Sequence, residues 1–104
     1  MLIDSHHHLW KYSSEHYGWI SDEMAILKHD FLSPQLSEVA REHGVDGFVS
    51  VQARQSVQET SDLLEIAAAQ PLIRGVVGWV PLADVGVAGI LEQFSDAQQL
   101  KGVR

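Results

Sequence analysis

Three consecutive histidines, His6, His7 and His8, follow the short run Leu2-Ile3-Asp4-Ser5 near the amino terminus. The run predicts a buried strand that leads directly into them. Because side chains in a strand alternate between two faces, His6 and His8 should point to one side and His7 to the other. Two imidazoles that converge in this way could bind a divalent metal, with zinc the first candidate. Such a metal would polarise a carbonyl group or activate water near neutral pH.

The His-x-His motif is short, and two polar side chains at a strand end can also have no ligand at all. Catalytic zinc usually takes three protein ligands, so His6 and His8 cannot complete such a site by themselves. The missing ligands, and a general base for water, would have to lie beyond Arg104 in a longer protein. Within the 104 residues we therefore expect metal ligands without a complete catalytic set.

Gln52 and Arg54 come at the end of a second predicted strand, Val45–Gln52, which is rich in β-branched residues. If the strand geometry persists, the two side chains share a face on the same rim as the histidines. An amide and a guanidinium there could orient the carbonyl or carboxylate of a substrate, the guanidinium through two parallel hydrogen bonds. The alternative is that Arg54 lies in a solvated loop and pairs with Glu59.

Aromatic side chains are the remaining candidates for substrate binding. Trp79 comes at the end of a third predicted strand, Ile73–Val80, where it could form one wall of a substrate pocket or fill the core. Trp10, Tyr17 and Trp19 lie on a long segment after the histidines. They could stack on a sugar ring, cover the opening of the site, or simply pack the segment onto the sheet. We expect the two tryptophans Trp10 and Trp79 to contact substrate.

Three helices should separate the strands. Ser33 and Pro34 predict the start of the first, with Ser33 as N-cap and Pro34 at the first helical position, and Gly44 should end it. The segment Ser56–Glu59 has the form of a capping box and predicts a second helix that ends near Pro71. This helix should direct four apolar side chains inward: Leu63, Leu64, Ala67 and Ala68. A third helix, capped by Asp84, should form its apolar face from Val87, Ile90, Leu91 and Phe94.

The order of the elements predicts the fold class. Residues from Trp10 to about Leu32 show no sustained period and predict a loop with one helical turn. Strands and helices then alternate until a last strand begins at Lys101–Arg104, which implies right-handed crossovers and a parallel sheet. No Gly-x-Gly-x-x-Gly follows the first strand, which argues against a dinucleotide-binding sheet. A (β/α)₈ barrel needs about 250 residues. We therefore expect residues 1–104 to be one partial domain, with three βα units and the start of a fourth strand.

The composition excludes several classes of protein. The 104 residues include 14 acidic and 7 basic ones, a net charge of −7 that disfavours binding to nucleic acid. No run approaches the ~18 apolar residues of a membrane span, and the amino terminus lacks the charged-then-apolar pattern of a secretion signal. The absence of cysteine excludes disulfides and thiolate metal sites and suits the reducing cytoplasm, where we expect the protein.

Four segments together resemble the amidohydrolase-related family of (β/α)₈-barrel hydrolases: Ile3–Trp10, Val51–Gln55, Gly75–Val80 and Lys101–Arg104. The similarity is to its sugar-lactonase branch, the L-fuconolactonase- and L-rhamnonolactonase-like enzymes, and it spans essentially the whole chain. The resemblance implies hydrolysis of a sugar-derived lactone to the open acid in bacterial carbohydrate catabolism. It also implies that His6 and His8 are the family's strand-one pair, which binds a divalent metal in some members and contacts substrate directly in metal-free ones. Gln52, Arg54 and Trp79 match pocket-lining positions.

Two other functions stay open. The same barrel could carry a decarboxylase, because the fold does not fix the reaction. The chain could also be a non-catalytic piece that associates with copies of itself, since a partial barrel leaves edge strands unpaired and an apolar face uncovered. The expected partner is a small-molecule sugar lactone, with a homo-oligomer as a further possibility and with neither nucleic acid nor membrane.

Overall fold

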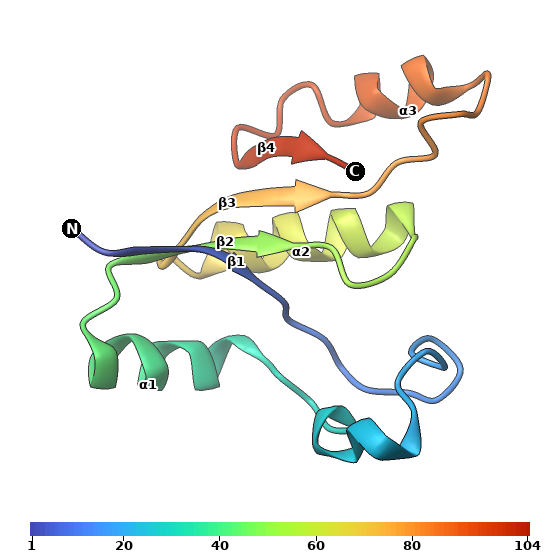
Figure 1. Cartoon of the computed structure of the whole chain (residues 1–104). Helices are drawn as coiled ribbons and strands as arrows, with labels where there is room; N and C mark the ends of the chain where they lie inside the picture. Colours follow the sequence, from blue (N-terminus) through green and yellow to red (C-terminus); the bar gives the residue numbers. More distant parts are fainter.

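The computed structural model describes residues 1–104 as a single sheet with helices packed against it (Figure 1). The strands are β1 (Ile3–His7), β2 (Gly47–Val51), β3 (Ile73–Gly78) and β4 (Leu100–Val103). The helices are the 3₁₀ helix η1 (Asp22–Leu27) and the α-helices α1 (Ser33–His43), α2 (Val57–Ala69) and α3 (Val87–Gln93). All neighbouring strands are parallel and lie in the order β1-β2-β3-β4. None of the helices has the length and apolar character needed to cross a membrane.

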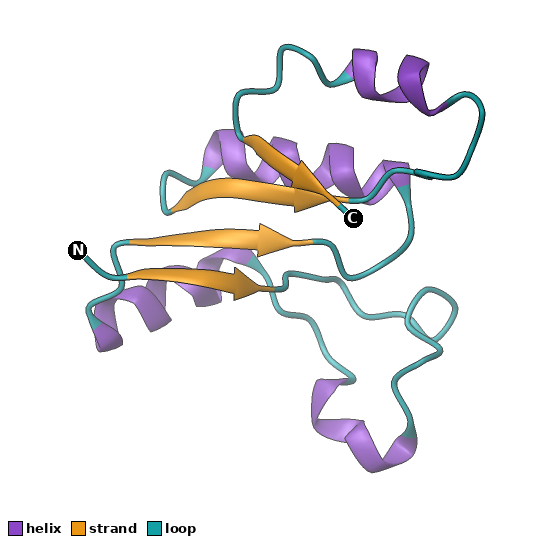
Figure 2. Cartoon of the chain, turned by 45° about the horizontal axis from the view of Figure 1, so that its top comes forward, coloured by secondary structure: helices purple, strands orange, loops and turns teal.

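This strand order distinguishes a barrel from a doubly wound sheet. In a doubly wound sheet the order reverses and helices cover both faces. Here every new strand adds to the same edge, and right-handed crossovers then keep the helices on one face (Figure 2). The main core joins α1 and α2 to that face through eight buried side chains: Leu9, Leu36, Ala40, Phe48, Leu63, Ala67, Ile73 and Val76. The arrangement is that of successive βα units of a barrel, as predicted.

The long first loop folds back on itself. Trp10 and Phe31 form an isolated antiparallel bridge, in which each backbone N–H donates to the other residue's carbonyl at 2.9 Å. Trp10, Tyr17 and Ile20 form a second buried cluster within the loop. The predicted helical turn is η1. The bridge thus joins the two ends of the loop just before α1 begins.

The first helix begins and ends close to where the sequence predicts, but its cap is different. Ser33 is the first residue of α1 and not its N-cap. The preceding residue, Leu32, donates its N–H to Gln35 Oε1 at 2.6 Å, so the Gln35 side chain takes the capping role. Gly44 ends the helix at φ 66°, a left-handed conformation that glycine adopts at little cost.

Two predictions about the later helices are wrong. Asp84 does not cap α3, because its Oδ1 accepts the N–H of Gly86 in the turn that precedes the helix. No residue of α3 is fully buried, so its apolar face is only partly covered. Ala68 is exposed, whereas Leu63 and Ala67 are buried. The step of about 100° per residue turns Ala68 away from the sheet that Ala67 contacts.

The second and third strands are shorter than the sequence predicts. β2 ends at Val51 and β3 ends at Gly78, so Gln52 and Trp79 each stand one residue beyond a strand. Strand geometry therefore does not persist as far as Arg54. The alternation of faces on which Gln52 and Arg54 were expected to share a side does not apply to them.

Gly78 lies where β3 meets α2, and the structure leaves no room there for a side chain. A Cβ at this position would lie 2.5 Å from Cγ2 and 2.8 Å from Oγ1 of Thr60. Thr60 is fully buried, and its hydroxyl is held by two hydrogen bonds to the backbone of Trp79. We therefore expect Gly78→Ala to lower the free energy of unfolding by about 1–3 kcal/mol, measured by urea denaturation.

Gly89→Ala is the matched control for this prediction. Gly89 lies within α3, and a Cβ built there meets nothing within 4 Å. Because alanine favours helix more than glycine does, this variant should be as stable as the original chain or up to about 1 kcal/mol more stable. Equal losses in both variants would contradict the tight packing of α2 on β3.

Candidate functional site

The rings of His6 and His8 lie together at the carboxyl end of β1. Their centroids are 5.0 Å apart, and the ring planes meet at 77°. The ring of His7 packs elsewhere, against Phe48 of the main core, at a centroid distance of 5.0 Å. Active sites of (β/α)₈ barrels form at the carboxyl ends of the strands. The histidine pair, His6 and His8, therefore stands where such a site is expected.

The imidazole of His8 is oriented by β2. Its Nδ1 lies 2.9 Å from the carbonyl oxygen of Val51, the last residue of that strand. A carbonyl oxygen can only accept, so Nδ1 carries the proton, and in the neutral ring the lone pair of Nε2 is free. Metal-binding histidines are commonly held by this kind of hydrogen bond through their second nitrogen. His8 is thus suited to bind a metal or accept a proton through Nε2.

The histidine pair fits a divalent metal site in part. His6 is exposed, and its backbone N–H donates to Oδ1 of Asp4 at 3.1 Å. No group of three His, Asp or Glu side chains comes together anywhere in the chain. Because a catalytic zinc usually takes three protein ligands, the pair can supply two of them and no more. Metal binding by His6 and His8 stays a prediction.

His7 belongs to the core and not to the site. Its Nε2 lies 2.8 Å from Oγ of Ser50, a residue with no exposed surface. Burial lowers the pKa of His7 from 6.5 to about 4, although the negative charge of Asp4 opposes this shift. His7 is therefore neutral at physiological pH, and the Ser50 hydroxyl satisfies one of its two ring nitrogens.

Gln52 and Trp79 lie at the ends of neighbouring strands. The N–H of Gln52 donates to the carbonyl of Val77 at 2.8 Å, and Gln52 is 9% exposed. Since His8 contacts the carbonyl of Val51, Gln52 directly follows the residue that orients His8. Trp79 is half-buried. The structure thus brings Gln52 near the pair, and the role of both residues in substrate binding stays a prediction.

Trp10 and Arg54 lie in a different place. Both line a cavity of about 450 Å³ between the first loop and α2, whereas the histidine pair, Gln52 and Trp79 do not line it. Arg54 forms no ion pair with Glu59; its Nη2 lies 3.4 Å from Oγ of Ser56, and its buried Nε has no hydrogen-bond partner.

Glu59 and Thr60 are buried polar residues that the sequence pattern did not identify as part of the site; they are 6% and 0% exposed. Burial raises the pKa of Glu59, opposed mainly by the backbone N–H groups of Arg54 and Ala53 and by the Arg54 charge. In the sequence Glu59 has the position of a capping-box residue, and Oγ of Ser56 does accept its N–H at 3.2 Å. Its carboxylate turns to the end of β2 instead. Nothing in the sequence pattern marks Thr60.

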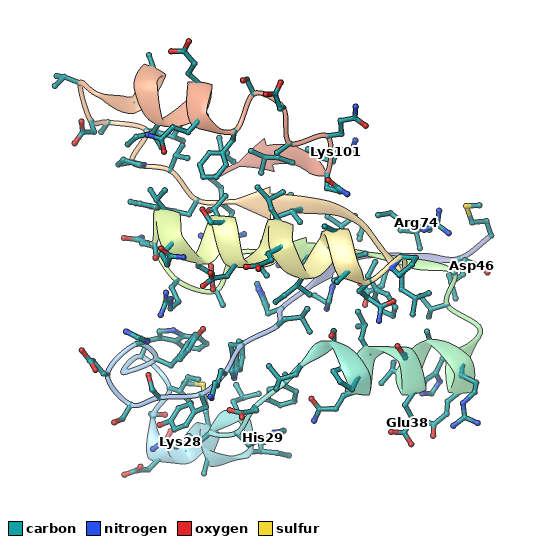
Figure 3. The ribbon with its side chains drawn as sticks, turned by 180° about the vertical axis from the view of Figure 1, so that it is seen from behind. Lys28, His29, Glu38, Asp46, Arg74 and Lys101 are labelled. Carbon is teal, nitrogen blue, oxygen red and sulfur yellow. The ribbon has the colours of Figure 1, made fainter.

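Hydrogen bonds connect neighbouring segments at the amino ends of the strands. Asp46 accepts the N–H of Leu2 through Oδ2 at 2.7 Å, and Arg74 donates to the carbonyl of Asp46 at 3.4 Å. In Figure 3, Arg74 and Asp46 lie at the end of the molecule opposite Lys28 and His29 of the first loop. In this fold the amino ends of the strands contribute stability and the carboxyl ends carry the chemistry.

Two curated proteins similar to the chain in sequence are both named L-fucono-1,5-lactonase. The one from Burkholderia multivorans is 39% identical over 82 residues, which cover 79% of this chain and 28% of that protein. The one from Burkholderia ambifaria is 26% identical over 102 residues, which cover 98% of this chain and 35% of that protein. No protein-family model matches the chain.

Solved structures show the same relationship. Two crystal structures of an amidohydrolase from Burkholderia multivorans, one with bound zinc and one with bound HEPES, superpose on the whole chain with a TM-score of 0.93 at 34% identity. The chain covers 36% of that protein. Amidohydrolase 2 from Bifidobacterium longum subsp. infantis matches 73% of this chain with a TM-score of 0.58 at 26% identity, over 31% of its own length.

Sequence similarity and fold agree across the chain, so the predicted resemblance and the partial-barrel fold are both confirmed. The chain spans 28–36% of the length of the relatives described above. Over its whole length the chain is similar, in sequence and in fold, to about a third of an amidohydrolase.

Proposed function

We propose that these residues are part of an enzyme that opens a sugar-derived lactone to the free acid by attack of water. The observation that carries the proposal is the pairing of His6 and His8 at the end of β1, with Nε2 of His8 free. It is supported by the similarity of the chain to two L-fucono-1,5-lactonases. A divalent metal, when bound, would polarise the lactone carbonyl, and zinc is the first candidate because a related amidohydrolase structure contains it.

The chain's own residues would bind and orient the substrate. The histidine pair supplies two nitrogen ligands for the metal or, in a metal-free site, two contacts to the lactone itself. Gln52 would donate its amide to the lactone, and Trp79 would provide an apolar wall at the end of β3. Arg54 and Trp10 line the separate cavity, and their contact with substrate stays a prediction. The general base that activates water would come from outside residues 1–104.

A barrel chimera tests this proposal: the 104 residues replace the segment that they match in the Burkholderia multivorans amidohydrolase. The purified chimera is offered a panel of five- and six-membered sugar lactones, and base consumption at constant pH is recorded. We expect one equivalent of base per lactone opened and no carbon dioxide. The 104-residue chain alone should show no turnover above background, because the general base and a third metal ligand are missing.

The same assay separates the alternatives. Release of carbon dioxide from a carboxylated substrate would favour a decarboxylase. A folded chimera that opens no lactone, together with a defined oligomer of the chain in light scattering, would favour a non-catalytic piece that associates with itself. Lactonase activity of the chain alone would show that the catalytic set does not need residues from outside.

A further inference from the structure

We propose that Glu59 and Thr60, adjacent residues in the first half of α2, are positioning residues for the carboxyl ends of β2 and β3. Each side chain binds the backbone of one strand end, and each strand end carries a predicted substrate-binding residue. Their importance for substrate binding rests on the proposed function, whereas the contacts themselves do not depend on it.

Glu59 holds the end of β2. Its Oε1 accepts the N–H of Ala53 at 2.9 Å and the N–H of Arg54 at 3.1 Å, and its Oε2 lies 3.2 Å from the N–H of Ala53. These two residues directly follow Gln52, and β2 itself ends at Val51. The segment therefore has no strand partner for these N–H groups, and the carboxylate satisfies them. Fixing the segment fixes the backbone from which the Gln52 and Arg54 side chains extend.

Thr60 holds the end of β3. Its Oγ1 accepts the N–H of Trp79 at 2.8 Å and donates to the carbonyl of the same residue at 2.8 Å. One hydroxyl thus satisfies both backbone groups of Trp79, one residue beyond the strand. The close approach needs Gly78, because any Cβ there would overlap Thr60. The backbone of Trp79, and with it the direction of the indole, is set by α2.

The side chains of Glu59 and Thr60 are buried although both are polar. Glu59 is 6% exposed and Thr60 is 0% exposed, whereas the next two residues, Ser61 and Asp62, are exposed. Burying a carboxylate is unfavourable unless it receives hydrogen bonds, and leaving a buried N–H without an acceptor is unfavourable too. Each partner therefore requires the other, which makes the spacing between α2 and the two strand ends well defined.

Amide hydrogen exchange of the 104-residue chain tests the proposal without any substrate. Glu59→Leu removes the acceptor of the Ala53 and Arg54 amides, which should exchange about 5–10-fold faster while the Trp79 amide is unchanged. Thr60→Val keeps the size of the side chain and should show the reverse pattern. A helix residue that acted only through overall stability would accelerate all three amides together.

Conservative variants test whether the hydrogen-bonding groups of Glu59 and Thr60 are what protects these amides. Thr60→Ser keeps the hydroxyl, and Glu59→Gln keeps one carbonyl oxygen that can occupy the place of Oε1, so both should restore the exchange rates. Ser61→Ala and Asp62→Asn are the exposed controls and should change nothing. Equal acceleration of all amides in Glu59→Leu and Thr60→Val, or conservative variants that behave like the disruptive ones, would overturn the proposal.

The unmodified chain gives a test that does not depend on whether a variant folds. In NMR spectra, the amide protons of Ala53 and Arg54 should shift as Glu59 ionises, with a midpoint above that of an ordinary glutamate, and the Trp79 amide should not. Ala53 and Arg54 amides that do not sense Glu59 would overturn the proposal. A barrel chimera without lactonase activity, in a chain that shows the exchange pattern, would contradict the proposed function and leave the positioning role supported.

Discussion

Replacing His8 by alanine in the barrel chimera should lower kcat/KM for lactone hydrolysis at least about 100-fold and should remove most of the bound metal. The reason is geometric: the hydrogen bond from Nδ1 to the Val51 carbonyl presents Nε2 in one fixed direction. His6→Ala should have the same effect, since the two rings lie 5.0 Å apart and are expected to act on one ligand. Steady-state kinetics and the zinc content of the purified protein measure both losses.

His43→Ala is the control for these variants, because His43 is an exposed histidine in the last turn of α1 and lies outside the cavity. It should retain full activity and full metal content. A His8→Ala chimera that keeps its zinc and its activity would contradict the role of the histidine pair. Loss of activity with unchanged zinc would instead indicate that His8 contacts the lactone directly and does not hold the metal.

Lowering the pH should destabilise the chain through His7. Its pKa is about 4 in the folded chain and 6.5 when the residue is free, because burial disfavours the charged ring. Between these values the unfolded chain binds a proton that the folded chain does not. The free energy of unfolding should therefore fall as the pH decreases through 6.5 and level off below about 4. A shift of this size corresponds to about 3 kcal/mol for a fully buried group, and partial exposure of the ring reduces this to about 1–2 kcal/mol.

Urea denaturation between pH 4 and pH 7 measures this dependence. His7→Gln removes the titrating group and leaves a side-chain amide that can still reach the Ser50 hydroxyl, so its stability should change much less over the same range. Glu59 works in the opposite sense, because its raised pKa makes the folded chain more stable as the pH decreases. His16→Gln should behave like the original chain. A His7→Gln chain that loses as much stability as the original would exclude His7 as the cause.

Much of the fold was predictable because the elements carry strong local signals. The run before the histidines, the β-branched segment around Phe48 and the glycine at position 44 each predict an element that the structure contains. The first strand was expected to be buried, but β1 is exposed from Ile3 to His6 because it lies at the edge of the sheet. Errors occur at the ends of elements. Whether a strand ends at Val51 or at Gln52 depends on its neighbours in the sheet, and the sequence does not show these. The misplaced caps also lie at ends of elements: the Gln35 side chain accepts the N–H of Leu32 at the start of α1, and the Asp84 side chain binds the turn before α3, which has no side-chain cap.

The site was predictable only in part. The alternation of strand side chains predicted that His6 and His8 would converge, and their rings do lie together. Arg54 was expected beside Gln52 on one face, but the chain leaves the strand first, and Arg54 lines a cavity next to α2. Contacts between distant segments, such as those of Thr60 with Trp79, have no local signature. They arise from how α2 packs on the sheet, which a single sequence does not specify.

The histidine pair itself can be tested in the 104-residue chain by a zinc titration followed through the ¹⁵N signals of the imidazoles. We expect Nε2 of His6 and Nε2 of His8 to shift together, at lower zinc concentration than any other histidine and with one zinc per chain. Nδ1 of His8 should keep its proton throughout. Zinc that affects the exposed histidines His16, His29 and His43 first, or that leaves His6 and His8 unchanged, would contradict a metal site at the end of β1.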